Sequence, residues 1–146
     1  MEEGLSLLSL INNSFDVKEV DVRTYSPLTL AFIGDGIYDI IIRTVIVERS
    51  NRPVNELHRR TSRFVKANTQ ALMIQALIPF LTEEEEAVYK RGRNAKSHTT
   101  AKNASLMDYR MATGFEALIG CLYLQDKTER ILELVKRGLA EIGMEL

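Results

Sequence analysis

The sequence predicts an all-α fold, organised as a single compact helical domain over residues 1–146. Apolar residues recur with helical period in several segments, and helix start and stop signals separate these segments. The chain is 45% hydrophobic and contains no internal repeat, low-complexity stretch or linker. A chain of this length buries roughly two thirds of its unfolded surface, which is enough for a substantial core.

The helices are expected in the order that follows. A short helix begins near Leu5 and ends at Asn12-Asn13, and a long helix starts at Ser26-Pro27 and reaches about residue 48. One helix covers 54–77 and ends before Pro79. A short helix begins with the capping box Thr82-Glu83-Glu84-Glu85 and runs into Tyr89, and two further helices cover 109–124 and 128–142. Residues 16–25 and 92–106 are expected to be loops. The long helix is expected to turn one broad apolar face to the core, formed by Leu28, Phe32, Ile33, Ile37, Ile40, Ile41 and Val45.

Cysteine content and the pattern of charges limit the cellular setting. Cys121 is the only cysteine and lies in an apolar run, so a buried reduced thiol in a reducing cytoplasm is expected. The acidic start of the chain argues against secretion. Charged residues interrupt the longest apolar region, 28–47, so no membrane span is expected.

One segment concentrates positive charge although the formal net charge of the chain is only −1. Residues 87–103 contain no acid, and their basic residues are Lys90, Arg91, Arg93, Lys96, His98 and Lys102. This segment is expected to bind nucleic acid, and the alternative is a solvated basic loop.

Two carboxylates lie inside segments that otherwise belong to the core, Asp35 and Glu116. A lone buried acid is costly, so each needs a partner. A divalent cation held between two helices would serve both, and the nearby Gly34 and Gly114 would let helices or substrate approach closely. The alternative is that both acids reach solvent or pair with arginines such as Arg43 or Arg110.

The motifs around these acids resemble those of the ribonuclease III family. Leu30-Ala31-Phe32-Ile33-Gly34-Asp35-Gly36-Ile37-Tyr38 resembles its first acidic motif, and Phe115-Glu116-Ala117-Leu118-Ile119-Gly120 with Tyr123-Leu124 resembles its second. Arg91-Gly92-Arg93-Asn94-Ala95-Lys96-Ser97, followed by Lys102-Asn103-Ala104, resembles the basic loop of the Mini-ribonuclease III branch. That branch has the catalytic domain without a separate domain for binding double-stranded RNA.

The resemblance implies a homodimeric endoribonuclease that uses Mg²⁺ to cut double-stranded RNA and leaves 5′-phosphate and 3′-hydroxyl ends. It implies that Asp35 and Glu116 are catalytic and hold the metal. Two further acid positions of the family fall on Ala31 and Thr113, and Thr113 and Asp39 are candidate accessory residues. Phe32 matches the family's dimer-interface aromatic, with ordinary core packing as the alternative. The implied RNA-binding residues are Arg91, Arg93, Asn94, Lys96, Ser97, Lys102 and Asn103.

Within the cell, the resemblance implies a role in the maturation of large-subunit (23S) ribosomal RNA in a bacterium. The replacement of two acids by Ala31 and Thr113 leaves a second hypothesis open, a non-catalytic RNA-binding or ribosome-associated dimer of the same fold. A phosphohydrolase acting on small nucleotides has less support, because the basic segment would then lack a purpose.

Overall fold

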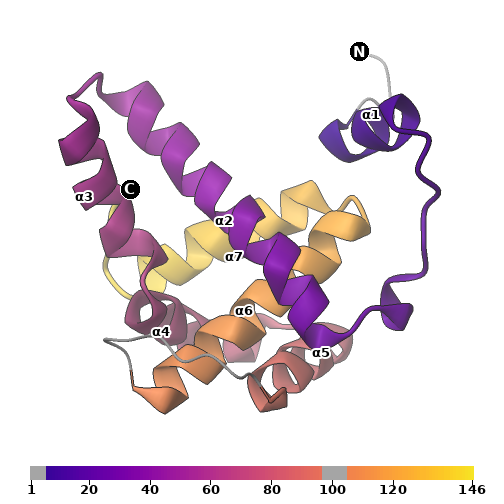
Figure 1. Cartoon of the computed structure of the whole chain (residues 1–146). Coiled ribbons are helices and arrows are strands. Elements are labelled where there is room, and N and C mark those ends of the chain that lie inside the picture. The colour runs from indigo at the N-terminus through magenta and orange to yellow at the C-terminus, as the bar shows by residue number, and fades with distance from the viewer. Residues whose placement is uncertain (1–5, 97–104) are drawn as a thin grey trace.

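Every secondary-structure element is helical among residues 6–96 and 105–146, the part of the chain that the computed structural model describes. The elements, drawn in Figure 1, are α1 (Leu7–Ser14), η1 (Val22–Thr24), α2 (Pro27–Arg49), α3 (Val54–Val65), α4 (Ala67–Leu77), η2 (Ile78–Phe80), α5 (Glu83–Asn94), α6 (Leu106–Leu124) and α7 (Thr128–Glu141). The predicted all-α class is therefore confirmed.

Helix α6 is the centre of the bundle. It packs most extensively against α2 and α5, and also contacts α4 and α7 (Figure 1). Between Met111 and Leu122, every residue of α6 is buried except Glu116. The core therefore surrounds this helix and leaves one carboxylate at its edge.

The predicted start signals of two helices are confirmed. The Ser26 hydroxyl accepts a hydrogen bond from the backbone N–H of Thr29 at the start of α2. Thr82 and Glu85 form the capping box of α5, each side chain accepting from the backbone N–H of the other. Glu85 also accepts two hydrogen bonds from Arg130, which ties α5 to α7.

The prediction of one helix over 54–77 is wrong, because the segment forms two helices that meet at Lys66. Lys66 has an extended backbone, with φ −66° and ψ 154°. An interrupted helix leaves its last carbonyls without intrahelical partners, and here side chains supply those partners. Thr69 donates to the Arg63 carbonyl, the Tyr38 hydroxyl to the Phe64 carbonyl, and Gln70 Nε2 to the Val65 carbonyl, each at 2.7 Å.

The predicted core face of α2 is partly wrong. Four of the seven predicted residues are half-buried, and two of these, Ile37 and Ile41, pack against the core, but none of the seven is fully buried. The buried residues are Leu30, Ala31, Gly34, Tyr38, Ile42 and Ile46. Phe32 is 82% exposed, and Leu28 and Ile40 are exposed as well. Apolar residues occur all round this helix, so periodicity alone does not select the buried side. Close packing against α6 selects it, since that contact requires the glycine at position 34.

The other predicted boundaries need smaller corrections. Helix α5 continues to Asn94 and α6 begins at Leu106, so both ends of the predicted loop 92–106 are helical. Residues 97–104 lie outside the described part. Cys121 is a buried free thiol, as expected. Among the described residues, no helix has both the length and the apolar character needed to cross a membrane.

Backbone contact between α2 and α6 depends on two glycines. A Cβ atom on Gly34 would lie 1.8 Å from the carbonyl oxygen of Glu116, and one on Gly120 would lie 1.9 Å from the carbonyl oxygen of Leu30. Both distances are far inside van der Waals contact. Only glycine lets the two helices cross this closely.

We predict that Gly34→Ala destabilises the protein by at least about 3 kcal/mol, because the added methyl group must push two backbones apart. Chemical unfolding followed by circular dichroism measures this loss. Gly36→Ala is the matched control in the same helix, since a Cβ there meets nothing within 4 Å, and it should keep the native helical content. Equal stability of the Gly34→Ala variant and the wild type would contradict the close crossing.

Candidate active site at the crossing of α2 and α6

Asp35 and Glu116 come together at the crossing of α2 and α6. Gly34 lies against the backbone of Glu116, so the next residue, Asp35, is carried to the same place. Tyr38, one turn further along α2, fixes that helix: its hydroxyl donates to the Phe64 carbonyl, and its ring packs edge-on against Phe115 at 5.4 Å. The predicted convergence of the two acids is therefore observed.

The two carboxylates interact with each other. Burial raises the pKa of Glu116 to about 8, and a hydrogen bond with Asp35 and the negative charge of Asp35 act in the same direction. The alternative that the acids reach solvent holds for Asp35, which is exposed, while Glu116 is only partly so. The alternative that arginines neutralise them is not observed, since the ion pairs of the described residues include neither acid, and Arg43 pairs with Asp39 instead. The pair therefore lacks positive charge, which a proton or a cation can supply.

Gln70 is a residue of this site that the sequence analysis missed. Its side chain is buried, and Nε2 donates both to the Val65 carbonyl at 2.7 Å and to Glu116 Oε2 at 3.3 Å. The Oε1 atom is buried and has no hydrogen-bond partner. The sequence gives no local signal for this residue, because the new helix that places position 70 near Glu116 starts at Lys66, where there is no proline, glycine or capping side chain.

The residues present fit a divalent cation. Two adjacent carboxylates without a basic partner offer the oxygen ligands that a hard cation prefers. Gln70, whose Nε2 lies 3.3 Å from Glu116 Oε2, also has a buried oxygen, Oε1, without a hydrogen-bond partner. Among the described residues, no three or more His, Cys, Asp or Glu side chains are grouped so that they could hold a metal ion. Magnesium tolerates so few protein ligands, because it keeps several of its waters and takes further ligands from phosphate.

The other acid-motif positions have different surroundings. Ala31 is buried in a small apolar cluster with Leu30, Ala117 and Cys121, where an acid would be desolvated. Thr113 is also buried, and its hydroxyl donates to the Tyr109 carbonyl of its own helix. Both positions thus contribute to the packing of the helices around the crossing.

Asp39 and Gly114 also have structural contacts. Asp39 forms an ion pair with Arg43 at 2.7 Å, one turn away on α2. A Cβ atom on Gly114 would meet the Tyr89 ring at 2.6 Å, so this glycine permits close packing of α6 against α5. The expectation that Gly114 allows a close approach is confirmed, with a helix as the neighbour.

Four of the predicted RNA-binding residues lie in the described part of the chain. Arg91, Arg93 and Asn94 belong to the last turn of α5, and Lys96 follows it. Arg93 Nε donates to Asn94 Oδ1, and the Arg93 guanidinium lies 5.5 Å from the centre of the Tyr89 ring. The basic residues thus begin on an ordered helix end. Ser97, Lys102 and Asn103 lie outside the described residues.

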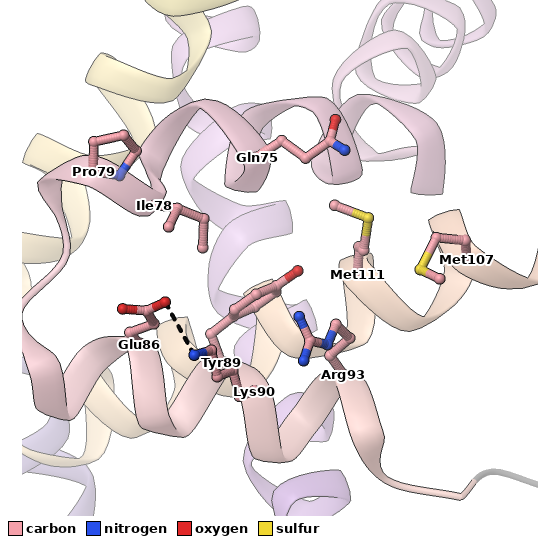
Figure 2. Close-up of a pocket in the computed structure, with 9 residues that line it drawn as sticks. All are labelled: Gln75, Ile78, Pro79, Glu86, Tyr89, Lys90, Arg93, Met107 and Met111. Carbon is pink, nitrogen blue, oxygen red and sulfur yellow. Dashed lines mark ion pairs between the residues drawn. The ribbon is translucent and has the colours of Figure 1, made fainter.

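An open groove of about 670 Å³ runs beside this helix end, between α4, α5 and the first turns of α6 (Figure 2). Figure 2 shows Arg93 beside the Tyr89 ring, facing Met111, while Lys90 is paired with Glu86. The groove does not include Asp35 or Glu116. Its lining is mainly apolar, and its two basic residues, Lys90 and Arg93, both belong to α5.

A second basic surface, on α3, was missed by the sequence analysis. Arg59 and Arg63 are exposed on this helix, and Lys66 is exposed directly after its end. None of the three forms an ion pair with the described residues, whereas Arg60 pairs with Glu56. In the sequence these residues are scattered among Thr, Ser and Phe. They share one side only once they are placed on a helix.

Phe32 lies on the outer side of α2, and its 82% exposure excludes core packing within the chain. Leu28 and Ile40, one turn before it and two turns after it, are exposed on the same side. Exposed apolar stripes of this kind mark surfaces that associate with another molecule.

Comparison with known proteins gives a consistent result. Residues 28–127 match the Ribonuclease III domain. Mini-ribonuclease 3 of Clostridium tetani (strain Massachusetts / E88) is 52% identical over 117 residues, which cover 80% of this chain and 78% of that protein. Mini-ribonuclease 3 of Thermoanaerobacter sp. (strain X514) is 44% identical over 137 residues, which cover 94% of this chain and 96% of that protein.

A solved structure agrees with these relatives. The crystal structure of a Fusobacterium nucleatum protein superposes with a TM-score of 0.73 at 34% identity, covering 80% of this chain and 93% of that one. The chain therefore belongs to the ribonuclease III family of endoribonucleases, in its Mini-ribonuclease III branch.

Proposed function

We propose that this protein is a magnesium-dependent endoribonuclease that cleaves double-stranded RNA as a homodimer. The observation that carries the proposal is the meeting of Asp35 and Glu116 at the glycine-dependent crossing of α2 and α6. Membership of the Mini-ribonuclease III branch supports the same activity. The products are 5′-phosphate and 3′-hydroxyl ends.

Asp35 and Glu116 would hold the cation, and Gln70 would hold Glu116 in position through its hydrogen bond. When bound, Mg²⁺ supplies positive charge at the scissile phosphate and lowers the pKa of a water that attacks it. Thr113 and Asp39 are proposed as accessory groups around the two acids. The carboxylates would be ready for this task because no arginine or lysine of the described residues competes for them.

Recognition of the duplex would depend on shape and on the charge of its phosphates. A duplex of RNA presents phosphates and 2′-hydroxyl groups across a shallow groove, which cationic and hydrogen-bonding side chains can contact without reading sequence. Arg91, Arg93, Asn94 and Lys96 at the end of α5 fit this role, and the missed basic side of α3 adds to it. Only the resemblance to the Mini-ribonuclease III branch assigns three further residues to this surface, namely Ser97, Lys102 and Asn103.

Dimerisation is proposed through the exposed side of α2, where Phe32 protrudes. A dimer gives two active sites, one for each strand of a duplex. We further propose that the cellular substrate is the precursor of 23S ribosomal RNA and that the enzyme works in the cytoplasm. The resemblance to Mini-ribonuclease III supports the substrate, and the lone buried thiol is consistent with a reducing compartment.

Asp35→Asn and Glu116→Gln are each expected to lower the rate of duplex cleavage by about a hundredfold or more, because the cation loses a charged ligand. Gel assays with a long RNA duplex and Mg²⁺ measure the rate, and chelation with EDTA should abolish cleavage by the wild type. Glu129→Gln, at an exposed acid on α7, is the matched control and should cleave normally. Duplex binding without any cleavage by the wild type would instead favour a non-catalytic RNA-binding dimer.

Gln70→Met is expected to raise the Mg²⁺ concentration needed for half-maximal cleavage roughly tenfold or more, because Glu116 loses the group that orients it. The substitution keeps the length of the side chain. Gln75→Met, an exposed position on the same helix, serves as the control. Affinity for the duplex without Mg²⁺ and the melting temperature are measured in parallel. Loss of both would indicate a damaged fold and would contradict a specific role for Gln70.

Arg91→Glu is expected to weaken duplex binding and to reduce the slope of log affinity against log salt concentration by about 1, as one phosphate contact is lost. Fluorescence anisotropy at several salt concentrations measures both quantities. Lys136→Glu makes the same charge change on the exposed side of α7 and should have little effect. Equal losses from the two substitutions would indicate a general effect of net charge and would remove Arg91 from the RNA surface.

A further inference from the structure

The N-terminal arm, defined here as residues 7–20, exposes nearly all of its apolar side chains. None of the eight residues of α1 is buried, and Phe15, just after the helix, is 75% exposed. The exposed large apolar residues of the arm are Leu7, Leu10, Ile11, Phe15, Val17 and Val20. An arm of this composition in free solution would leave a large apolar surface in water.

The rest of its own chain does not cover the arm. Helix α1 has no extensive contact with any other helix, and neither apolar cluster of the core includes a residue of the arm. Figure 1 shows α1 set apart from the bundle, at the end of an extended segment. Val22 and Tyr25 pack against the core, so the chain is anchored only where the arm ends.

Local interactions alone do not account for the helical form of α1. The Ser6 hydroxyl caps it by accepting from the Ser9 backbone N–H, but its first turn has no acid and its last turn no base. An isolated helix of this length is unstable in water, because the cost of nucleation exceeds the gain from so few hydrogen bonds. Its stability therefore requires packing of the apolar side against another surface.

The exposed stripe of α2 is a surface that matches the arm. The stripe consists of Leu28, Phe32, Ile40 and Val47. In the described part of the chain sixteen large apolar side chains are exposed, and ten of them belong to the stripe or to the arm. At ~100 Å² per side chain the two surfaces present on the order of 1,000 Å². A stable interface needs about 800 Å² per partner.

We propose that the arm of each protomer packs against the α2 stripe of a second copy of this chain, so that two arms are exchanged in a symmetric dimer. The interface would be isologous, since each protomer contributes the same arm and the same stripe. Residues 16–21, which lie between α1 and the anchor at Val22, span roughly 20 Å when extended, which lets the arm reach a neighbouring subunit. The proposal rests on the homodimer proposed above and extends it, because it adds a second element beside Phe32.

The first test measures dimerisation of the full chain by sedimentation velocity. Leu7→Glu combined with Leu10→Glu should raise the dimer dissociation constant at least tenfold. Leu132→Glu is the matched control, because Leu132 on α7 has the same 46% exposure as Leu10 but lies outside both surfaces. Dimerisation of the arm variant with the affinity of the wild type would overturn the proposal.

The second test identifies the surface that the arm contacts. Chains with a photoreactive benzophenone amino acid at position 10 are mixed with an excess of ¹⁵N-labelled wild-type chains, irradiated and digested. Mass spectrometry should find the unlabelled (light) arm of the photoreactive chain joined to ¹⁵N-labelled (heavy) peptides of α2 from the wild-type chain. Crosslinks to light peptides alone, or to heavy peptides other than α2, would overturn the exchange. Neither test involves RNA, so a failed cleavage assay and a failed arm exchange are separate results.

Discussion

The close crossing of α2 and α6 is the constraint on which the rest of the site depends. Gly34 and Gly120 let the two backbones touch, with each glycine placed against a carbonyl of the other helix. This contact selects the buried side of α2 and carries Asp35 to Glu116. It also forces the opposite side of α2, with Phe32, away from the core. One pair of glycines thus determines both the position of the acids and the orientation of the apolar stripe.

The sequence predicted the acidic pair but not the surroundings that hold it. Asp35 and Glu116 could be found because charged residues inside apolar runs are costly and need a partner. Gln70 could not, because it is located by a helix break that carries no proline or glycine. Lys66 takes an extended conformation, and the break is stabilised by side chains from other turns and from α2, among them Tyr38. Such long-range hydrogen bonds cannot be deduced from local propensity.

The error on α2 has a similar origin. A helix that is apolar on all sides gives a weak periodic signal, and the residues with the largest side chains were assigned to the core. The structure buries the side that contains Gly34, because close approach to α6 requires glycine there, and large residues on the same side, such as Tyr38 and Ile42, are buried with it. Large exposed residues such as Phe32 and Ile40 then have no partner in their own chain, which makes the error itself informative about association.

The break at Lys66 and the acidic pair are joined by a single side chain. Gln70 Nε2 donates both to the Val65 carbonyl, which the break leaves without an intrahelical partner, and to Glu116, which lies at the crossing. Any shift of α4 relative to α6 therefore alters the end of α3 and the carboxylate together. The basic side of α3 lies on the helix that this junction terminates. Gln70 thus connects the proposed metal site with the orientation of one of the surfaces proposed to bind RNA.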